Sequence, residues 1–301
     1  MGKKDLLAKA YFSDNKRFSD LFNYYLYDGK NVIKENDLTE LSTESIFNDI
    51  NRKETKNRNR DLLKLLILKT DNINNYLILG IENQTKADYE MVLRIEEYNI
   101  MKYRDQIKNH FNLNINNDKI KLEKGLIPII TIVIYYGNNK WDMPLDLYSY
   151  FNIKDKEILK YISNYKLNLI SPYDLNDSDF IKMKSDIRIL LEYLKYQKDS
   201  YNLKLLLNEE RYKHVKYDTY QFINELTNSN SNIDIIEGDE VNMCKAINDL
   251  IKEGKIEGKK EGKEEATYEY VTSMHKKGMD EITISNLLDI DIKKVIEILK
   301  N

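Results

Sequence analysis

Two apolar runs separated by a short polar segment give the clearest pattern in the chain. The first run covers residues 61–69, and the second, residues 76–84, reads Tyr-Leu-Ile-Leu-Gly-Ile-Glu-Asn-Gln. This pattern predicts a β-hairpin. Because side chains alternate between the two faces of a strand, Glu82 and Gln84 are expected to project together from the end of the second strand. Antiparallel pairing then brings Asp61, at the start of the first strand, beside them.

The segments around the hairpin predict a helix before it, and a helix and a strand after it. Residues 17–28 and 87–111 place apolar side chains at helical spacing, and Gly29 ends the first of these helices. Residues 127–136 are almost continuously apolar, which is typical of a central strand buried on both faces. The second helix would cross one face of the sheet to reach that strand. Residues 30–60 are polar and mixed, which predicts a connecting segment of turns.

The C-terminal half is predicted to be mostly helical. Residues 145–227 show helical spacing interrupted by a short extended piece at 167–172. Three glycines then recur every fourth residue between 254 and 262, among Glu and Lys. This spacing favours a flexible charged linker, because glycine weakens helices, and the alternative is a helix that a partner approaches closely. Residues 279–299 predict two short helices about a turn, an arrangement that binds DNA or mediates self-association.

Composition narrows the classes of function. The chain has 301 residues, 32% of them charged, and a formal net charge of −3, so a DNA site would have to be a local basic patch. One cysteine and three histidines exclude a disulfide framework and a zinc-thiolate cluster, and a single cysteine fits the reducing cytoplasm. The longest apolar run, residues 126–136, is about half the length of a membrane span. The candidate chemistry is therefore the pair of carboxylates at the hairpin end, a set that suits a hard cation.

The order and spacing of several motifs resemble a known nuclease family. The sequence is similar to the Rpn family of recombination-promoting nucleases, often labelled transposases, within the PD-(D/E)XK superfamily. The resemblance covers most of the chain, from about Phe18 to the end. The matching residues are Arg60-Asp61-Leu62, Ile78 to Gln84, Tyr89, Met91, Arg94, Tyr98, Leu126 to Thr131, Tyr135-Tyr136-Gly137 and Trp141-Asp142. The resemblance implies a restriction-endonuclease-like α/β core, with a mixed central sheet flanked by helices and a largely helical C-terminal extension.

The resemblance also implies a Mg²⁺-dependent DNA endonuclease, with Mn²⁺ as an alternative cofactor, acting in recombination, mobile elements or anti-phage defence. The carboxylates of Asp61 and Glu82 and the backbone carbonyl of Asn83 would hold the metal. Gln84 stands where the superfamily commonly has lysine. Glutamine can orient water or phosphate by hydrogen bonds but carries no charge. The glutamine then implies that the activity is modest, that a second metal compensates, or that a nearby cation supplies the charge. The candidate cations are Arg60, Arg94, Lys64 and Lys86.

Asp20 is expected as a further metal ligand, because an acid on the helix before the hairpin occurs in the family. The other interpretation is an ordinary acid near the start of a helix, favoured by the helix dipole. Contacts to DNA phosphates are expected from four basic residues: Arg58, Arg60, Lys86 and Arg94. The alternatives are a solvated basic loop or hairpin tip at residues 51–60 and, for Arg94, an ion pair with a nearby acid.

The expected organisation is a nuclease-like core at residues 1–150, a helical extension packed on it at 151–235, and a charged helix or linker with a helix-turn-helix-like tail at 236–301. The expected partners are DNA and a second copy of the chain, the homodimer forming through the C-terminal tail, and no membrane. The competing function is a catalytically degenerate nuclease scaffold that binds DNA or a protein.

Overall fold

The computed structural model describes residues 2–49, 54–59, 61–70, 73–109, 112–115, 118–121, 125–229 and 239–300. The chain divides into two compact units, Met1–Val241 and Asn242–Asn301. The sheet and the helical extension therefore belong to the same unit, and the tail forms the other.

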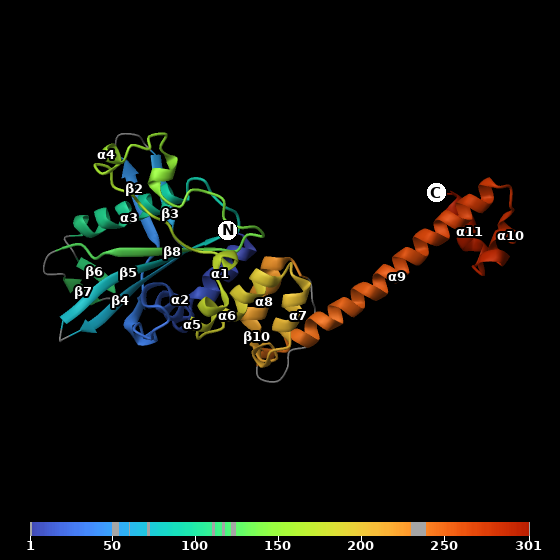
Figure 1. Cartoon of the computed structure of the whole chain (residues 1–301), viewed down its shortest axis with the longest axis horizontal. Coiled ribbons are helices and arrows are strands. Elements are labelled where there is room, and N and C mark those ends of the chain that lie inside the picture. Colours follow the sequence, from blue (N-terminus) through green and yellow to red (C-terminus); the bar gives the residue numbers. More distant parts are fainter. Residues whose placement is uncertain are drawn as a thin grey trace. The chain divides into compact units, whose positions relative to one another are not determined.

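A five-stranded mixed sheet forms the centre of the first unit (Figure 1). Its order is β1 (Leu38–Glu40), β4 (Leu62–Thr70), β5 (Ile73–Gln84), β8 (Ile129–Tyr135) and β9 (Asn168–Ile170). Strand β4 is antiparallel to β1 and β5, whereas β8 is parallel to β5 and β9. The predicted α/β class with a mixed sheet is confirmed.

The predicted hairpin is present as β4 and β5. The pairing runs from Leu62↔Ile81 to Thr70↔Ile73, so both strands extend further toward the turn than the apolar runs do. Ile73, Asn74 and Asn75 belong to β5, although the sequence pattern predicts a turn there. Backbone pairing satisfies their N–H and C=O groups whatever their side chains are.

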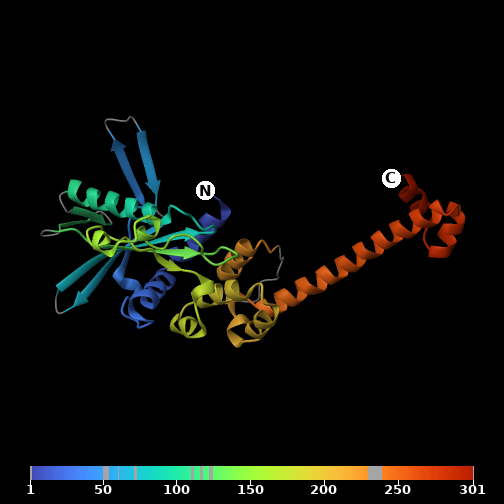
Figure 2. The ribbon, with the colours of Figure 1, turned by 45° about the horizontal axis from the view of Figure 1, so that its top comes forward.

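Helices cover both faces of the sheet (Figure 2). Helix α3 (Met91–Lys108) lies on one face, and α2 (Asn15–Tyr27) lies on the other. The apolar side of α3 packs on the sheet in one core cluster, made of Met91, Val92, Ile95, Tyr98, Val133 and Leu167. The predicted helix 17–28 corresponds to α2, which ends where Asp28 and Gly29 adopt positive φ angles. Both central strands are thus shielded from water.

Several elements escape the sequence pattern. Helix α1 (Lys3–Ser13) was not predicted, because its apolar residues do not form a single stripe. Two polar hairpins, β2 (Glu44–Asp49) with β3 (Glu54–Asn59) and β6 (Asn112–Ile115) with β7 (Asp118–Lys121), occupy segments predicted as connections. Their sequences lack the alternation of a half-buried strand, so polarity alone could not reveal them.

Short helices and strands complete the first unit. The remaining elements are η1 (Glu35–Asp37), η2 (Leu147–Tyr150), α4 (Lys156–Leu159), η3 (Pro172–Asp174), α5 (Asp177–Lys182), α6 (Ile187–Tyr196), α7 (Ser200–Leu207), η4 (Glu210–Tyr212), β10 (Val215–Lys216), α8 (Tyr217–Thr227) and β11 (Glu240–Val241). Arg17 of α2, only 3% exposed, pairs with Asp186 at 2.6 Å and with Asp218 at 2.7 Å. Because those acids lie at the starts of α6 and α8, this buried network ties the extension to the core.

The second unit contains α9 (Met243–Lys276), α10 (Glu281–Leu288) and α11 (Ile292–Lys300). Its small core is built on Val271, Ile284 and Val295. Of the two predicted alternatives, a flexible linker and a helix, the structure shows the helix, because α9 continues through the glycines. The two predicted short helices are α10 and α11. No helix in the described part of the chain is both long enough and apolar enough to cross a membrane.

Candidate functional site

At the end of the hairpin, where the backbone pairing stops, the Asp61 carboxylate accepts a hydrogen bond from the backbone of β5. The β4–β5 ladder stops at Leu62↔Ile81. Two residues beyond Ile81, the backbone N–H of Asn83 donates to Asp61 Oδ2 over 2.7 Å, and the Asn83 amide Nδ2 donates to the same oxygen over 3.2 Å. Two donors from one residue therefore fix Asp61 beside the last residues of β5.

Tyr136, the residue that follows β8, makes hydrogen bonds to Asn83 and to Gln84. The Tyr136 hydroxyl donates to Asn83 Oδ1 over 2.7 Å, and the Tyr136 backbone N–H donates to the Gln84 carbonyl over 2.8 Å. Tyr136 is 4% exposed, and its ring meets Phe222 of α8 at a centroid distance of 5.5 Å. Burial, followed by the charges of Tyr11 and Asp61, raises the pKa of Tyr136 well above its usual value. Its hydroxyl therefore remains a hydrogen-bond donor at physiological pH.

Glu82 is held by a different partner. Its carboxylate is 4% exposed, and Arg94 of α3 contacts Oε1 at 3.1 Å. The same guanidinium pairs with Asp88 at 2.5 Å. For Arg94 the predicted alternative, an ion pair with a nearby acid, is what the structure shows. Arg94 therefore stands directly beside one of the predicted metal ligands.

Asp61 and Glu82 thus lie near the same end of the β4–β5 hairpin, and each is bonded to its own partner. The side chains of Asn83 and Glu82 point to opposite faces of β5, because they are consecutive in a strand. The N–H of Asn83 is directed at Asp61, and its carbonyl leaves the strand on the same side. The carboxylates of Asp61 and Glu82 and the backbone carbonyl of Asn83 therefore lie near the end of β5.

Burial of Asp61 has an energetic consequence. Desolvation raises the pKa of the Asp61 carboxyl above its ordinary value, against the two hydrogen bonds from Asn83, which lower it. Keeping the Asp61 carboxylate ionised at neutral pH therefore lowers the free energy of unfolding. Strain of this kind is common where a charged group serves chemistry, although structural networks cause it too.

Asp20 does not join these carboxylates. Its oxygens accept hydrogen bonds from the backbone N–H of Lys184 at 2.8 and 3.0 Å, and from the N–H and hydroxyl of Ser185, both at 2.6 Å. No group of three His, Cys, Asp or Glu side chains that could hold a metal occurs in the described segments. The expectation of a three-acid site is therefore not met. Asp20 joins α2 to the turn before α6, because three donor groups in four hydrogen bonds satisfy its charge.

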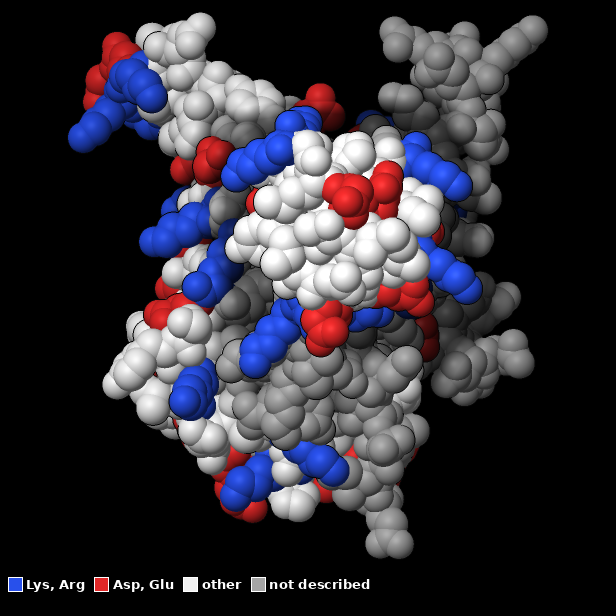
Figure 3. Space-filling view, turned by 90° about the vertical axis from the view of Figure 1, so that its right-hand side faces the viewer, with Lys and Arg blue, Asp and Glu red and all other residues white. Residues whose placement is uncertain are grey.

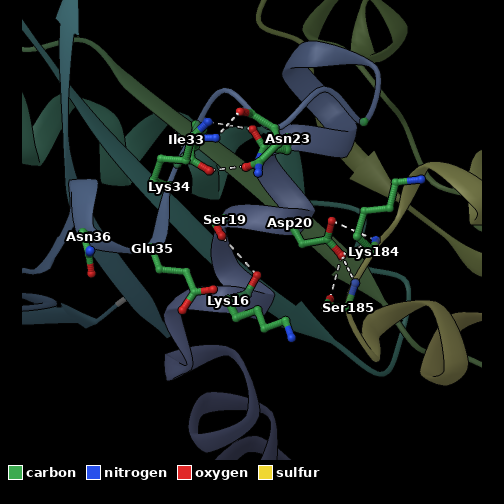
Figure 4. Close-up of a pocket in the computed structure, with 12 residues that line it drawn as sticks. Lys16, Ser19, Asp20, Asn23, Ile33, Lys34, Glu35, Asn36, Lys184 and Ser185 are labelled. Carbon is green, nitrogen blue, oxygen red and sulfur yellow. Dashed lines mark hydrogen bonds between the residues drawn. The ribbon is translucent and has the colours of Figure 1, made fainter.

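A pocket of about 490 Å³ opens beside Asp20 (Figure 4). Its buried floor is satisfied by the protein: Asn23 Nδ2 donates to the Ile33 carbonyl, and Asn23 Oδ1 accepts from the backbone N–H groups of Val32 and Ile33. Among the lysines at its margin, Lys184 points away from Asp20 and donates to the Ile181 carbonyl. The hydrogen bonds of Asn23 hold the loop after α2 in place. The polar groups described here bond to the protein backbone and do not converge on a single ligand position.

The remaining predicted residues are spread around the strand end. Gln84 is half-buried, and Lys86 is exposed in the loop before α3. Arg60 and the side chain of Arg58 lie outside the described residues. In the view of Figure 3, Lys and Arg side chains are interspersed with Asp and Glu. Lys64, a sequence candidate for supplying charge, cannot do so, because it is 1% exposed and bonds to Ser13 and Asn15.

Two features of the site escaped sequence reasoning. The Asn83 side chain links Asp61 to Tyr136, whereas the sequence suggested only its backbone carbonyl. Tyr136 belongs to the matched Tyr135-Tyr136-Gly137 motif, but the sequence gives it no role. Its role follows from the register: Gln84 pairs with Tyr135, and the hydroxyl of the next residue reaches Asn83. The available signal was the polar hydroxyl at the end of the central strand, next to Gly137.

One family model matches the chain over residues 2–219, and its description is "Putative transposase, YhgA-like". No curated protein and no solved structure matches the sequence.

Proposed function

Because that match covers more than half of its residues, the chain belongs to the YhgA-like transposase family, and we propose that it is a metal-dependent endonuclease that hydrolyses phosphodiester bonds in DNA. The single observation that best supports this activity is the meeting of Asp61 with the Glu82–Asn83–Gln84 segment at the end of the sheet. The role proposed is DNA cleavage in recombination, mobile elements or anti-phage defence.

The donor set at the strand end fits a divalent cation. Mg²⁺ prefers carboxylate and carbonyl oxygens and keeps several waters, and Mn²⁺ accepts the same ligands. In our proposal Asp61, Glu82 and the carbonyl of Asn83 hold the metal, and Asp20 does not. Asp61 Oδ1 accepts no hydrogen bond from a described residue, so it is the oxygen available to a cation. A bound metal would polarise the scissile phosphate and lower the pKa of a water.

Gln84 and Arg94 would complete the site. Gln84 follows the two ligand residues and is half-buried, so its amide is placed to orient a phosphate oxygen or a water. Arg94 provides a fixed positive charge beside Glu82, which the glutamine cannot supply. A guanidinium can contact a phosphate and a carboxylate at once, because its donors lie in a planar fork. Lys86, Arg58 and Arg60 are proposed to contact the DNA backbone.

A catalytically degenerate scaffold is the second candidate. It is favoured by the ion pair that occupies Glu82 and by the lack of a three-acid group among the described residues. Such a protein would bind DNA or a protein without cleaving it. The two functions differ in whether Asp61 and Glu82 bind a metal.

We further propose that the protein works as a homodimer in the cytoplasm. The C-terminal unit exposes apolar side chains on its two short helices, with Ile282 63% and Leu287 61% exposed. A second copy could cover them, and two copies would present two sites for a double-strand break. The single cysteine, Cys244, is compatible with a reducing compartment.

The test is cleavage of supercoiled plasmid by the purified full chain, with Mg²⁺, with Mn²⁺ and with EDTA. The variants are Asp61→Ala and Glu82→Ala, and the matched control is Asp155→Ala, an acid at the start of α4 in the same unit. Nicking that needs metal, is lost in both site variants and persists in the control would establish the nuclease. A folded wild-type protein that cleaves under none of these conditions would favour the degenerate scaffold.

A further inference from the structure

The hydrogen bonds behind Asp61 point to a residue that no motif assigns. We infer that Tyr136 is a positioning residue, which acts through the Asn83 amide to hold the Asp61 carboxylate in the orientation that metal binding requires. This inference rests on the proposed function, since it concerns the same metal site. It adds a residue that directly follows β8 and supplies no ligand itself.

The first step of the argument concerns the direction of the amide. Asn83 has one side-chain acceptor and one side-chain donor group, and the two are used by different neighbours. Its oxygen accepts from Tyr136 over 2.7 Å, so its nitrogen is turned toward Asp61, where it donates over 3.2 Å. A tyrosine hydroxyl that donates thus selects one of the two amide orientations. The opposite orientation would place a carbonyl oxygen against the carboxylate.

The second step concerns which carboxylate oxygen remains available. Both donors of Asn83 contact Oδ2 of Asp61, at 2.7 and 3.2 Å. The other oxygen, Oδ1, is left without a hydrogen bond from the described residues. The N–H and the carbonyl of Asn83 leave β5 on the same side, the side of Asp61, so in our inference Oδ1 and this carbonyl bind the same cation.

The third step concerns rigidity. The Tyr136 ring is 4% exposed, it packs on Phe222 at 5.5 Å, and its own N–H is paired with Gln84. The hydroxyl therefore has little freedom to leave Asn83. Groups that orient the ligands of a metal site usually affect metal affinity or activity by about 10–100-fold when they are removed.

The test uses Tyr136→Phe, which removes only the hydroxyl. The matched control is Tyr212→Phe, because Tyr212 is also fully buried and its hydroxyl bonds to Ile189 and Glu192, in the helical extension. Both variants and the wild type are titrated with Mn²⁺ in a calorimeter, with Asp61→Asn as the reference for a damaged site. Plasmid nicking is measured in parallel as a function of Mg²⁺ concentration.

The expected result is Mn²⁺ binding about 10-fold weaker in Tyr136→Phe, with a matching increase in the half-saturating Mg²⁺ concentration. Tyr212→Phe should bind Mn²⁺ like the wild type even if it lowers thermal stability as much. Equal Mn²⁺ affinity in Tyr136→Phe and the wild type would overturn the inference. Wild-type protein that binds Mn²⁺ but does not cleave would reject the nuclease and leave the positioning role supported, whereas protein that binds no Mn²⁺ would overturn both.

A second variant tests the route by which Tyr136 acts, and by itself it tests the amide step even if Tyr136→Phe does not fold. Asn83→Ala removes the amide and leaves the backbone N–H that donates to Asp61. It should weaken Mn²⁺ binding to a similar extent, and adding Tyr136→Phe to it should cause no further loss, because Tyr136 acts only through the amide. Additive losses in the double variant would show that Tyr136 affects the site by another route, contrary to the inference.

Discussion

The ammonium nitrogen of Lys64 lies 2.5 Å from the side-chain oxygen of Asn15, and 2.5 Å from the carbonyl oxygen of Ser13. Lys64 belongs to β4 and is 1% exposed, while Ser13 ends α1 and Asn15 begins α2. A buried lysine therefore joins the sheet to the corner between two helices. Its ammonium also lies 4.8 Å from the centre of the Phe18 ring, a cation–π arrangement.

Substitution Lys64→Met should change how stability depends on pH. Burial lowers the pKa of Lys64 below its ordinary value of 10.5, against the charges of Glu40 and Asp14, which raise it. Between that lowered pKa and 10.5, the unfolded state binds more protons than the folded state, so wild-type stability gains from Lys64 as pH rises. Urea unfolding across this range should show the gain in the wild type and not in Lys64→Met. Near neutral pH the two should agree within about 1 kcal/mol, since hydrophobic replacements of buried charges are often neutral.

The control for this comparison is Lys69→Met, because Lys69 lies on the same strand and is exposed. It should leave the pH dependence unchanged. If the free energy of unfolding depends on pH in the same way in Lys64→Met and in the wild type, the prediction fails and the Lys64 ammonium is hydrated in solution.

Loss of Arg94 should destabilise the fold strongly. Arg94→Gln leaves the buried Glu82 carboxylate without its guanidinium, which typically costs about 3 kcal/mol. Arg188→Gln is the matched control: Arg188 is exposed to the same extent, 25%, and it pairs with the equally buried Glu192. Glu192 keeps its second ion pair, with Arg211, so its loss should be nearer 1 kcal/mol. Equal losses in chemical denaturation would contradict the importance of the Arg94 contact.

Asp20 should prove structural and not catalytic. Asp20→Ala leaves the N–H groups of Lys184 and Ser185 without their acceptor, so we expect a loss of about 3 kcal/mol in the free energy of unfolding. Asp20→Asn keeps an acceptor oxygen and should lose less. Mn²⁺ affinity, measured on the folded fraction of Asp20→Asn, should equal that of the wild type. A clear fall in that affinity would return Asp20 to the metal site.

Asp61→Asn should stabilise the protein while abolishing cleavage. Burial raises the pKa of Asp61 above 3.8, so wild-type stability falls as pH rises from 3.8 through the folded pKa. Asparagine removes the charge but can still accept from the Asn83 N–H. Stabilising substitutions at functional sites are commonly worth about 0.5–2 kcal/mol. Thermal unfolding at neutral pH, with Asn83→Ala as a destabilised reference, should show the gain, and a lower midpoint for Asp61→Asn would refute it.

Sequence patterns could predict the sheet because its strands are buried. The runs at residues 61–69 and 127–136 are apolar, since they pack between layers of helices, and burial is what periodicity reports. Strands β2, β3, β6 and β7 pair through their backbones with little apolar signal, so they were missed. The glycines of α9 favour a flexible linker in the sequence, yet the structure has a helix there. Nothing lies within 4 Å of a Cβ added at Gly258 or Gly262, so no close packing requires glycine at these positions.

The candidate site was predictable in part for a similar reason. Asp61, Glu82 and Gln84 belong to one hairpin, so their proximity follows from local pairing. Asp20 was misplaced because its true partners, Lys184 and Ser185, lie more than 160 positions away along the chain, and no local pattern encodes such a contact. Tyr136 was matched only as part of a motif and given no role, because its contact depends on the register of a parallel pair.

The mixed sheet also sets an order of assembly for the site. The β4–β5 hairpin closes across a short turn, so the bond between Asp61 and Asn83 can form early and locally. The pairing of β5 with β8 must wait until the whole α3 crossover has been enclosed, which makes it a slow, non-local step. The bond from Tyr136 to Asn83 is therefore among the last to form. In a nascent chain the Asn83 amide would not yet be oriented by Tyr136, so the site would be ready to bind metal only after the fold is complete.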